Sequence, residues 1–223
     1  MNKKLFISRA LTEDSPIWSF GKSKEIQVFH QSLIDFTPVR FNHIPGADWI
    51  FFYSKKAVHY FYRQALDQNL PIKPMIGTMG LGTLNALKEF GKSADFAGNG
   101  QPEQVANAFR VLAKGKKVLF PRALNSMQSI QNILGESIEA IDLVVYSNSP
   151  NRNFELPVLD YLLFTSPMNV EAYCIKYRWR PGQKVVAIGS STAQSLADNG
   201  LEQYGVADQP SEQGMIRALE KML

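Results

Sequence analysis

The sequence predicts an α/β protein built from two similar lobes, each with a parallel sheet. Short apolar runs alternate along the chain with amphipathic segments of helical period, and the runs lead into small-polar loops that open helices. The clearest case is residues 160–200, which read as strand, loop, helix, strand, loop and helix. Strands that alternate with helices in this way are typical of parallel α/β sheets.

A repeat within the chain predicts two lobes rather than one large sheet. Three segments occur twice, and they pair as residues 4–10 with 117–123, 49–58 with 161–170, and 75–80 with 187–192. The last pair aligns Gly77 with Gly189. Similarity over this many segments indicates a duplication.

The first half of the chain begins with a short apolar strand at residues 4–8 and a second strand region at 27–41. Pro38 would be awkward in a central strand, so it indicates an edge strand or a crossing between lobes. The aromatic run 49–53 indicates a buried strand, and Ser54 caps a helix whose apolar residues recur at helical spacing. The elements expected next are a strand at 70–76, a glycine turn at 77–82, a helix at 83–90, a strand at 94–97 and a helix at 103–113.

The second half repeats this alternation. Pro121 and Arg122 are expected in a loop after a strand, and Ser166 and residues 189–192 are expected to open helices. The predicted elements are strands at 116–120, 141–146, 161–164, 185–188 and 205–209, with further helices at 126–134 and 211–222.

Two places allow the backbone to cross between lobes. Residues 147–153 (SNSPNRN) form the most linker-like segment of the chain, and residues 36–41 contain Pro38. We therefore expect a discontinuous lobe of residues 1–36 and 150–223 and a continuous lobe of residues 37–149.

Composition excludes several classes of protein. Of 223 residues, 45% are hydrophobic and 20% charged, as in soluble globular proteins. No apolar segment approaches the thickness of a bilayer and no signal peptide is visible, so we expect a cytoplasmic protein without membrane contact. The single cysteine, Cys174, excludes a disulfide framework and is expected to be a buried structural thiol. The net charge of +4 is spread along the chain, which argues against nucleic acid as a partner and leaves a polyanionic small molecule open.

Several familiar motifs are absent. The run Gly77-Thr-Met-Gly80-Leu-Gly82 has the spacing G-x-x-G-x-G, which differs from the dinucleotide-binding pattern. The three histidines, His30, His43 and His59, lack the spacing of metal ligands, so no metal site is expected. No serine lies in a G-x-S-x-G elbow, which argues against a serine hydrolase.

What remains is a set of loops that follow strands. Loops at Ser54, Gly77, Ser166 and Gly189 all come at the carboxyl ends of predicted strands, where open α/β sheets bind ligands. Each serine alone would be only a helix cap. Arg9, Arg122, Lys55 and Lys56 also follow strands directly, and Tyr146 ends a strand before a presumed crossing. For Tyr146, packing at a hinge and a role in chemistry are equally compatible with the sequence.

These residues together resemble the uroporphyrinogen-III synthase family. The likeness extends over the whole chain as an ordered set of segments, since no single short motif is diagnostic. The segments are Phe51-Phe-Tyr-Ser-Lys-Lys-Ala-Val58, Gly98-Asn99, Phe120-Pro-Arg122, Val144-Val-Tyr146, Leu163-Phe-Thr-Ser-Pro167, Ala187-Ile-Gly-Ser-Ser-Thr-Ala193 and Gln209-Pro-Ser-Glu-Gln-Gly214.

The resemblance implies two α/β lobes joined by a two-stranded connection, with the N-terminal segment completing the C-terminal lobe. It implies a cofactor-free, metal-free lyase that binds hydroxymethylbilane, a linear tetrapyrrole with eight carboxylates, between the lobes. The enzyme removes water, inverts the last pyrrole ring and closes the macrocycle to uroporphyrinogen III, in haem biosynthesis. We expect a monomer.

The resemblance also implies site residues. Tyr146 corresponds to a tyrosine that helps the hydroxyl group leave as a proton donor. The implied substrate-binding residues are Arg9, Ser54, Lys56, Gly98, Asn99, Arg122, Thr165, Ser166, Gly189, Ser191 and Thr192.

The chain departs from the family pattern at two places. Lys55-Lys56 stands where members often have Pro-Arg, which removes the bidentate arginine fork. The Gly77 loop is irregular where members have a Gly-x-x-Thr-Ala-like turn. These departures leave an inactive paralogue as one alternative. A non-catalytic two-lobed ligand-binding protein is the other, since such proteins also pair α/β lobes around a cleft.

Overall fold

The computed structural model describes residues 2–223, which form two sheets, each belonging to its own compact unit. Unit 1 contains the chain up to Asp35 together with Ser149–Leu223, and unit 2 is Phe36–Asn148. The divisions fall one residue before the boundaries expected from the sequence. Both lie inside strands, β3 (Ile34–Pro38) and β8 (Glu139–Pro150), which are neighbours in the sheet of unit 2.

The two segments that cross between the units are strands, whereas the sequence predicted an irregular linker at residues 147–153. Residues 147–150 continue β8 instead of forming an irregular linker, because β8 has β3 as a neighbour that satisfies its backbone groups. Pro38 is the last residue of β3, which is an edge strand as the sequence predicted.

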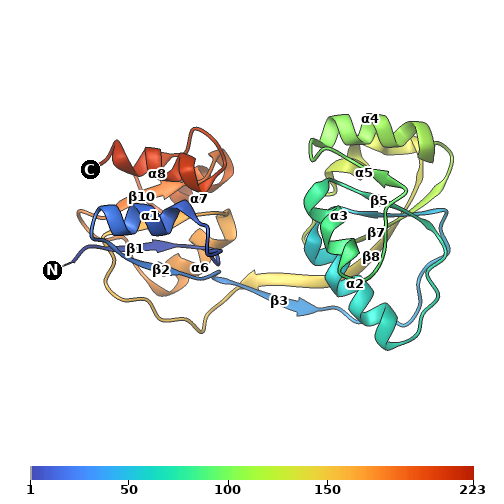
Figure 1. The fold of residues 1–223 in the computed structure, drawn as a ribbon, viewed down its shortest axis with the longest axis horizontal. Helices are drawn as coiled ribbons and strands as arrows, with labels where there is room; N and C mark the ends of the chain where they lie inside the picture. The colour runs from blue at the N-terminus through green and yellow to red at the C-terminus, as the bar shows by residue number, and fades with distance from the viewer. Residues whose placement is uncertain (1) are drawn as a thin grey trace. The chain divides into compact units, whose positions relative to one another are not determined.

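Unit 1 is a five-stranded parallel sheet with helices on both faces (Figure 1). The strand order is β11-β10-β9-β1-β2, so the order reverses between β1 and β9. Its elements are β1 (Lys4–Ile7), α1 (Pro16–Ser23), β2 (Gln27–His30), β9 (Tyr161–Phe164), α6 (Pro167–Lys176), β10 (Lys184–Ala187), α7 (Ser190–Asp198), β11 (Gly205–Val206) and α8 (Glu212–Glu220).

Unit 2 has a six-stranded sheet in the order β3-β8-β7-β4-β5-β6. The strands from β8 to β6 pair in parallel. Its further elements are β4 (Trp49–Phe52), α2 (Lys55–Asp67), β5 (Met75–Thr78), α3 (Leu81–Lys88), β6 (Phe96–Ala97), α4 (Pro102–Ala113), β7 (Lys117–Ala123), α5 (Ser129–Leu134) and a 3-10 turn at Gly135–Ser137.

Equivalent strands lie in the same spatial order in the two sheets, but they follow one another in a different order along the chain. Strands β8-β7-β4-β5-β6 of unit 2 correspond to β2-β1-β9-β10-β11 of unit 1. The predicted duplication is therefore visible as two matching sheets. The unit 2 segment is inserted in the chain between β2 and β9.

Register corrects one part of the sequence repeat. Phe52 pairs with Thr78 in unit 2, and Phe164 pairs with Ala187 in unit 1. Since Phe52 and Phe164 correspond, Thr78 corresponds to Ala187 and Gly80, not Gly77, corresponds to Gly189. Gly77 lies inside β5, where a Cβ would stand 2.7 Å from the Phe51 ring, so it is needed for packing and not for the turn.

Alternating residues fill the two faces of each sheet. On β4, Ile50 and Phe52 pack on one face with α2, while Trp49 and Phe51 pack on the other with α4. On β9, Leu162 and Phe164 face one core cluster and Leu163 the other. Each unit is therefore a three-layer sandwich with its own two hydrophobic cores.

Cys174 is half-buried on α6 instead of fully buried, and burial raises the pKa of its thiol to about 11. No helix within residues 2–223 combines the length and the apolar character needed to cross a membrane.

Asn169 ties the start of the crossing segment to helix α6. Its Oδ1 accepts the Leu33 N–H at 2.8 Å, its Nδ2 donates to Ser166 Oγ at 2.8 Å, and the residue is only 3% exposed. Asn169→Ala leaves the Leu33 N–H buried without a partner. We expect the free energy of unfolding to fall by about 1–3 kcal/mol, measured by urea denaturation. The exposed Asn107→Ala is the control, and equal stability of the two variants would contradict this role.

Candidate functional site

The predicted site residues divide between the two units. All strands of unit 1 are parallel, as are those from β8 to β6 in unit 2, so the loops that follow them gather at one edge of each sheet. Unit 1 carries Arg9, Thr165, Ser166, Gly189, Ser191 and Thr192, and unit 2 carries Ser54, Lys56, Gly98, Asn99, Arg122 and Tyr146.

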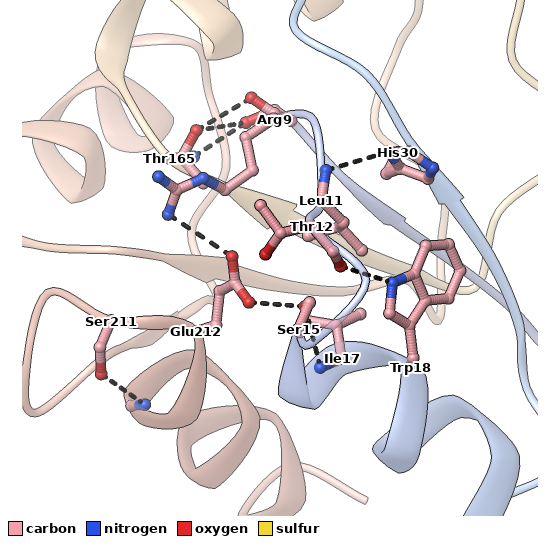
Figure 2. A network of polar contacts seen from close by, with 12 residues as sticks. Arg9, Leu11, Thr12, Ser15, Ile17, Trp18, His30, Thr165, Ser211 and Glu212 are labelled. Carbon is pink, nitrogen blue, oxygen red and sulfur yellow. Dashed lines mark hydrogen bonds and ion pairs between the residues drawn. The ribbon is translucent and has the colours of Figure 1, made fainter. Parts of the chain in front are cut away.

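In unit 1, Thr165 joins the ends of β1 and β9, where the strand order reverses. Its N–H donates to Ser8 Oγ at 2.8 Å, and its hydroxyl donates to the Ser8 carbonyl at 2.9 Å (Figure 2). Ser8 is 1% exposed. The Thr165 hydroxyl therefore serves the scaffold at this edge.

Arg9 projects beside this junction and keeps most of its donors free. Its Nη1 lies 3.7 Å from Glu212 Oε1, and Ser15 Oγ donates to the other carboxylate oxygen at 2.6 Å (Figure 2). The Arg9 side chain is 47% exposed. A long, exposed ion pair is weak, so Arg9 is available to an anionic ligand.

The helices that follow β9 and β10 begin differently. The Ser166 hydroxyl accepts from the N–H and the side-chain amide of Asn169, so it is a helix cap. Gly189 begins α7 without a side-chain cap. Ser191 is exposed, but Thr192 is 1% exposed and belongs to the core. The first N–H groups of α7 therefore lack a competing side-chain acceptor, which favours an anion there.

In unit 2, a hollow of about 360 Å³ lies at the ends of β4, β5 and β6. Gly80 lies so close to Gly100 that a Cβ on Gly80 would be 3.1 Å from the Gly100 backbone nitrogen. A Cβ on Gly82 would be 2.9 Å from Lys55 Cε. The lining residues are Ser54, Lys55, Met79, Gly80, Leu81, Gly82, Thr83, Asn99 and Gly100.

This hollow revises the interpretation of the Gly77 loop. Gly80-Leu-Gly-Thr83 has the spacing of Gly189-Ser-Ser-Thr192, and Thr83, like Thr192, is buried. A Gly-x-x-Thr turn is therefore present in unit 2, three residues after Gly77. The matching spacing is the signal that the sequence comparison missed when it aligned the two Ile-Gly pairs.

Gly98 and Asn99 serve the structure of this edge. A Cβ on Gly98 would stand 2.5 Å from the Met79 carbonyl, so only glycine fits. The Asn99 side chain donates to Gln104 and accepts the Gln101 N–H at 3.0 Å, which orders the turn before α4.

Arg122 lies inside β7 instead of the expected loop, because β7 pairs with β8 as far as Ala123. Its guanidinium donates to the carbonyls of Ala123 and Leu124 and to Asp142 Oδ2 at 2.7 Å. The side chain is only 14% exposed. Both of its terminal nitrogens are therefore engaged within unit 2, unlike those of Arg9.

Tyr146 lies within β8, four residues before its end, at a β-bulge. Arg122 pairs with Val144 but Ala123 pairs with Tyr146, so Val145 is the extra residue. The bulge turns Val145 and Tyr146 into the same core cluster, although neighbours on a regular strand face opposite sides. Nothing in the sequence indicates this bulge.

The bulge brings Tyr146 to Ser54 and helix α2. The Tyr146 ring stacks on Tyr60 with 5.0 Å between ring centroids, and the residue is 7% exposed. Burial raises the pKa of its phenol, and hydrogen bonding with Ser54 opposes this only in part. The Phe36 ring lies between these residues and Lys56 in the chain of contacts. Its centroid is 6.1 Å from the centroid of the Tyr146 ring and 3.7 Å from the Lys56 ammonium. Ser54 and Tyr146 thus form a pair, a protonated phenol with a hydroxyl beside it, and the Lys56 ammonium lies against the neighbouring Phe36 ring.

Comparison with known proteins identifies the family. The family model described as uroporphyrinogen-III synthase HemD matches residues 22–217. Porphyrin biosynthesis protein HemD from Ruminiclostridium josui is 30% identical over 189 residues, and the match covers 77% of this chain. The chain spans only 37% of the length of that relative.

Two solved structures share the fold. Uroporphyrinogen-III synthetase from Helicobacter pylori is 18% identical with a TM-score of 0.71, and the match covers 100% of both chains. A mutant uroporphyrinogen III synthase from Thermus thermophilus is 16% identical with a TM-score of 0.57, over 98% of this chain and 99% of that one. Both matches cover nearly all of this chain, so the shared α/β fold includes both sheets.

The Arg122–Asp142 contact predicts a pH dependence of stability. Burial of Asp142 raises its pKa, but hydrogen bonds from Arg122, Gln131 and Gln128 outweigh burial, so the pKa lies below its ordinary value of 3.8. The carboxylate therefore stabilises the fold above pH 3.8, and this contribution disappears as the pH falls through the folded-state pKa.

We expect the urea midpoint of the Asp142→Asn variant to fall less steeply than that of the wild type below about pH 4. The control is Asp208→Asn, which removes an exposed ion pair with Arg217. If the two variants show the same dependence on pH, Asp142 has no special contribution.

Proposed function

The chain belongs to the uroporphyrinogen-III synthase HemD family, and we propose that it converts hydroxymethylbilane into uroporphyrinogen III. The reaction removes the terminal hydroxyl group as water, inverts the last pyrrole ring and closes the macrocycle. The observation that carries this proposal is the buried phenol of Tyr146 beside Ser54, with Lys56 close by.

Tyr146 is suited to help the hydroxyl group leave. With a pKa above its ordinary value of 10.0, the phenol stays protonated at neutral pH and can donate a hydrogen bond to the leaving oxygen. The electron pair of the pyrrole nitrogen expels the hydroxyl group, the C–O bond breaks, and the phenolic proton passes to the departing oxygen. The tyrosinate recovers a proton when the closed ring loses one.

The remaining task is orientation, because the reactive intermediate closes unaided to the wrong isomer. The substituted carbon of the last ring must attack first, which requires the chain to be held in one folded conformation. A substrate with eight carboxylates has many groups that the protein can bind to fix this conformation. Groups able to hold them are present in both units, among them Arg9 and the start of α7 in unit 1, and Lys55 and Lys56 in unit 2.

Three further expectations stay predictions: a monomer, a cytoplasmic location, and activity without a cofactor or metal.

The decisive experiment supplies the purified protein with freshly generated hydroxymethylbilane. The products are oxidised, and the uroporphyrin isomers are separated by chromatography. We expect isomer III to dominate, since uncatalysed closure gives isomer I. Isomer I alone, formed at the rate of a protein-free blank, would refute the proposed function.

Removal of the Tyr146 hydroxyl tests its role as a proton donor. We expect Tyr146→Phe to lower kcat about 100-fold, because general acid assistance typically contributes 100-fold or more. Isomer III should still dominate, because the ring and its stacking on Tyr60 remain. Tyr204→Phe is the matched control, since Tyr204 packs at the edge of a core cluster in unit 1. Wild-type kcat in Tyr146→Phe would remove the proton-donor role and leave the orientation role intact.

A further inference from the structure

One face of helix α2 carries a row of basic side chains. Lys56, His59, Tyr60 and Arg63 recur at positions three and four apart, so they lie along one side of the helix, while the opposite side is buried against β4 (α2 in Figure 1). These four residues line a hollow of about 250 Å³. Nothing in the mechanism above uses His59 or Arg63.

The positive charge of this hollow is largely unbalanced. Among residues 2–223, neither Lys56 nor Arg63 takes part in an ion pair. His59 Nε2 lies 3.6 Å from Glu89 Oε2, and its ring packs against Phe90. Partial burial also lowers the pKa of Lys56. An anion entering the hollow would meet two side chains, Lys56 and Arg63, that have no ion-pair partner among the described residues.

Tyr60 is the aromatic residue that lines the hollow, and the Phe36 ring contacts one of the other lining residues, Lys56. The Lys56 ammonium sits 3.7 Å from the centroid of the Phe36 ring, which holds the cation in place. The Tyr60 hydroxyl donates to the Phe36 carbonyl at 3.3 Å, so Tyr60 presents its ring and not its hydroxyl. A site with apolar rings and cationic side chains matches a carboxylate on a short methylene arm, because the methylenes contact the rings and the carboxylate contacts the cations.

The Tyr60 ring connects the hollow to the proposed proton donor. The Tyr60 ring stacks directly on Tyr146, with an angle of 18° between their planes. A group held in the hollow is therefore one aromatic ring away from Tyr146. The volume of 250 Å³ is below that of pockets that enclose a drug-sized ligand, so it suits one arm of a larger molecule.

We propose that the hollow formed by Lys56, His59, Tyr60 and Arg63 binds one acetate or propionate arm of the tetrapyrrole, and so places the reacting pyrrole ring against Tyr146. Arg63 and His59 are the new binding residues. This inference rests on the proposed function for the identity of the ligand.

The test compares the double variant His59→Gln/Arg63→Gln with the wild type. We expect KM for hydroxymethylbilane to rise about tenfold, with kcat changed less than about twofold, because the lost contacts hold a part of the substrate that does not react. The control is Lys73→Gln/Lys92→Gln, which removes two lysine charges from exposed positions in unit 2, at least as much positive charge as the test variant loses. If both double variants change KM equally, the effect is one of overall charge and the proposal is wrong.

A second measurement separates this proposal from the proposed function. Uroporphyrin III, a stable octacarboxylate, is titrated into each protein and binding is followed by quenching of tryptophan fluorescence. If the wild type binds it and the His59/Arg63 variant binds about tenfold more weakly than the control, the hollow is an arm-binding site even if the wild type forms only isomer I. If the wild type is active but both variants bind and turn over alike, the site is refuted while the function stands.

Discussion

The pairing of β1 with β9 is the interaction on which the architecture of unit 1 depends. These strands are far apart in the chain, yet Leu5, Phe6 and Ile7 pair directly with residues of β9. Contacts at both ends fix the register: Asp160 accepts the Lys4 N–H at 2.9 Å, and Thr165 bonds to Ser8 across 157 residues of sequence. Closing so long a loop costs entropy, which is offset because the intervening segment forms unit 2 with its own core.

The same pairing creates the edge at which we propose that a ligand binds. It makes the strand order reverse between β1 and β9, and side chains at such a point extend beyond the sheet instead of being covered by a crossover helix. Arg9 and Thr165 occupy this point in unit 1. In unit 2, the corresponding reversal lies between β4 and β7, where Tyr53 and Arg122 take the positions of Thr165 and Arg9.

Equivalent positions in the two units nevertheless have different roles. Arg122 is clamped by Asp142, which pairs with Phe120. In unit 1, Ile7 is the equivalent of Phe120, and it pairs with His30 instead of an aspartate. The Nδ1 atom of His30 accepts the Leu11 N–H at 3.2 Å. Without a carboxylate at this position, Arg9 stays exposed. This difference in the neighbouring strand removes from Arg9 the carboxylate contact that Arg122 makes in unit 2.

The sequence by itself determined the duplicated α/β architecture, the two crossings and the capping serines, because apolar periodicity and cap residues are local signals that the chain carries in order. It also indicated Tyr146, Lys56 and Arg9, through resemblance to a family. Only the tertiary structure decided that Gly80 rather than Gly77 matches Gly189, that Arg122 is clamped and that Tyr146 is turned toward Tyr60. Each of these depends on strand register or on a bulge, which are set by partners distant in the sequence and leave no local pattern.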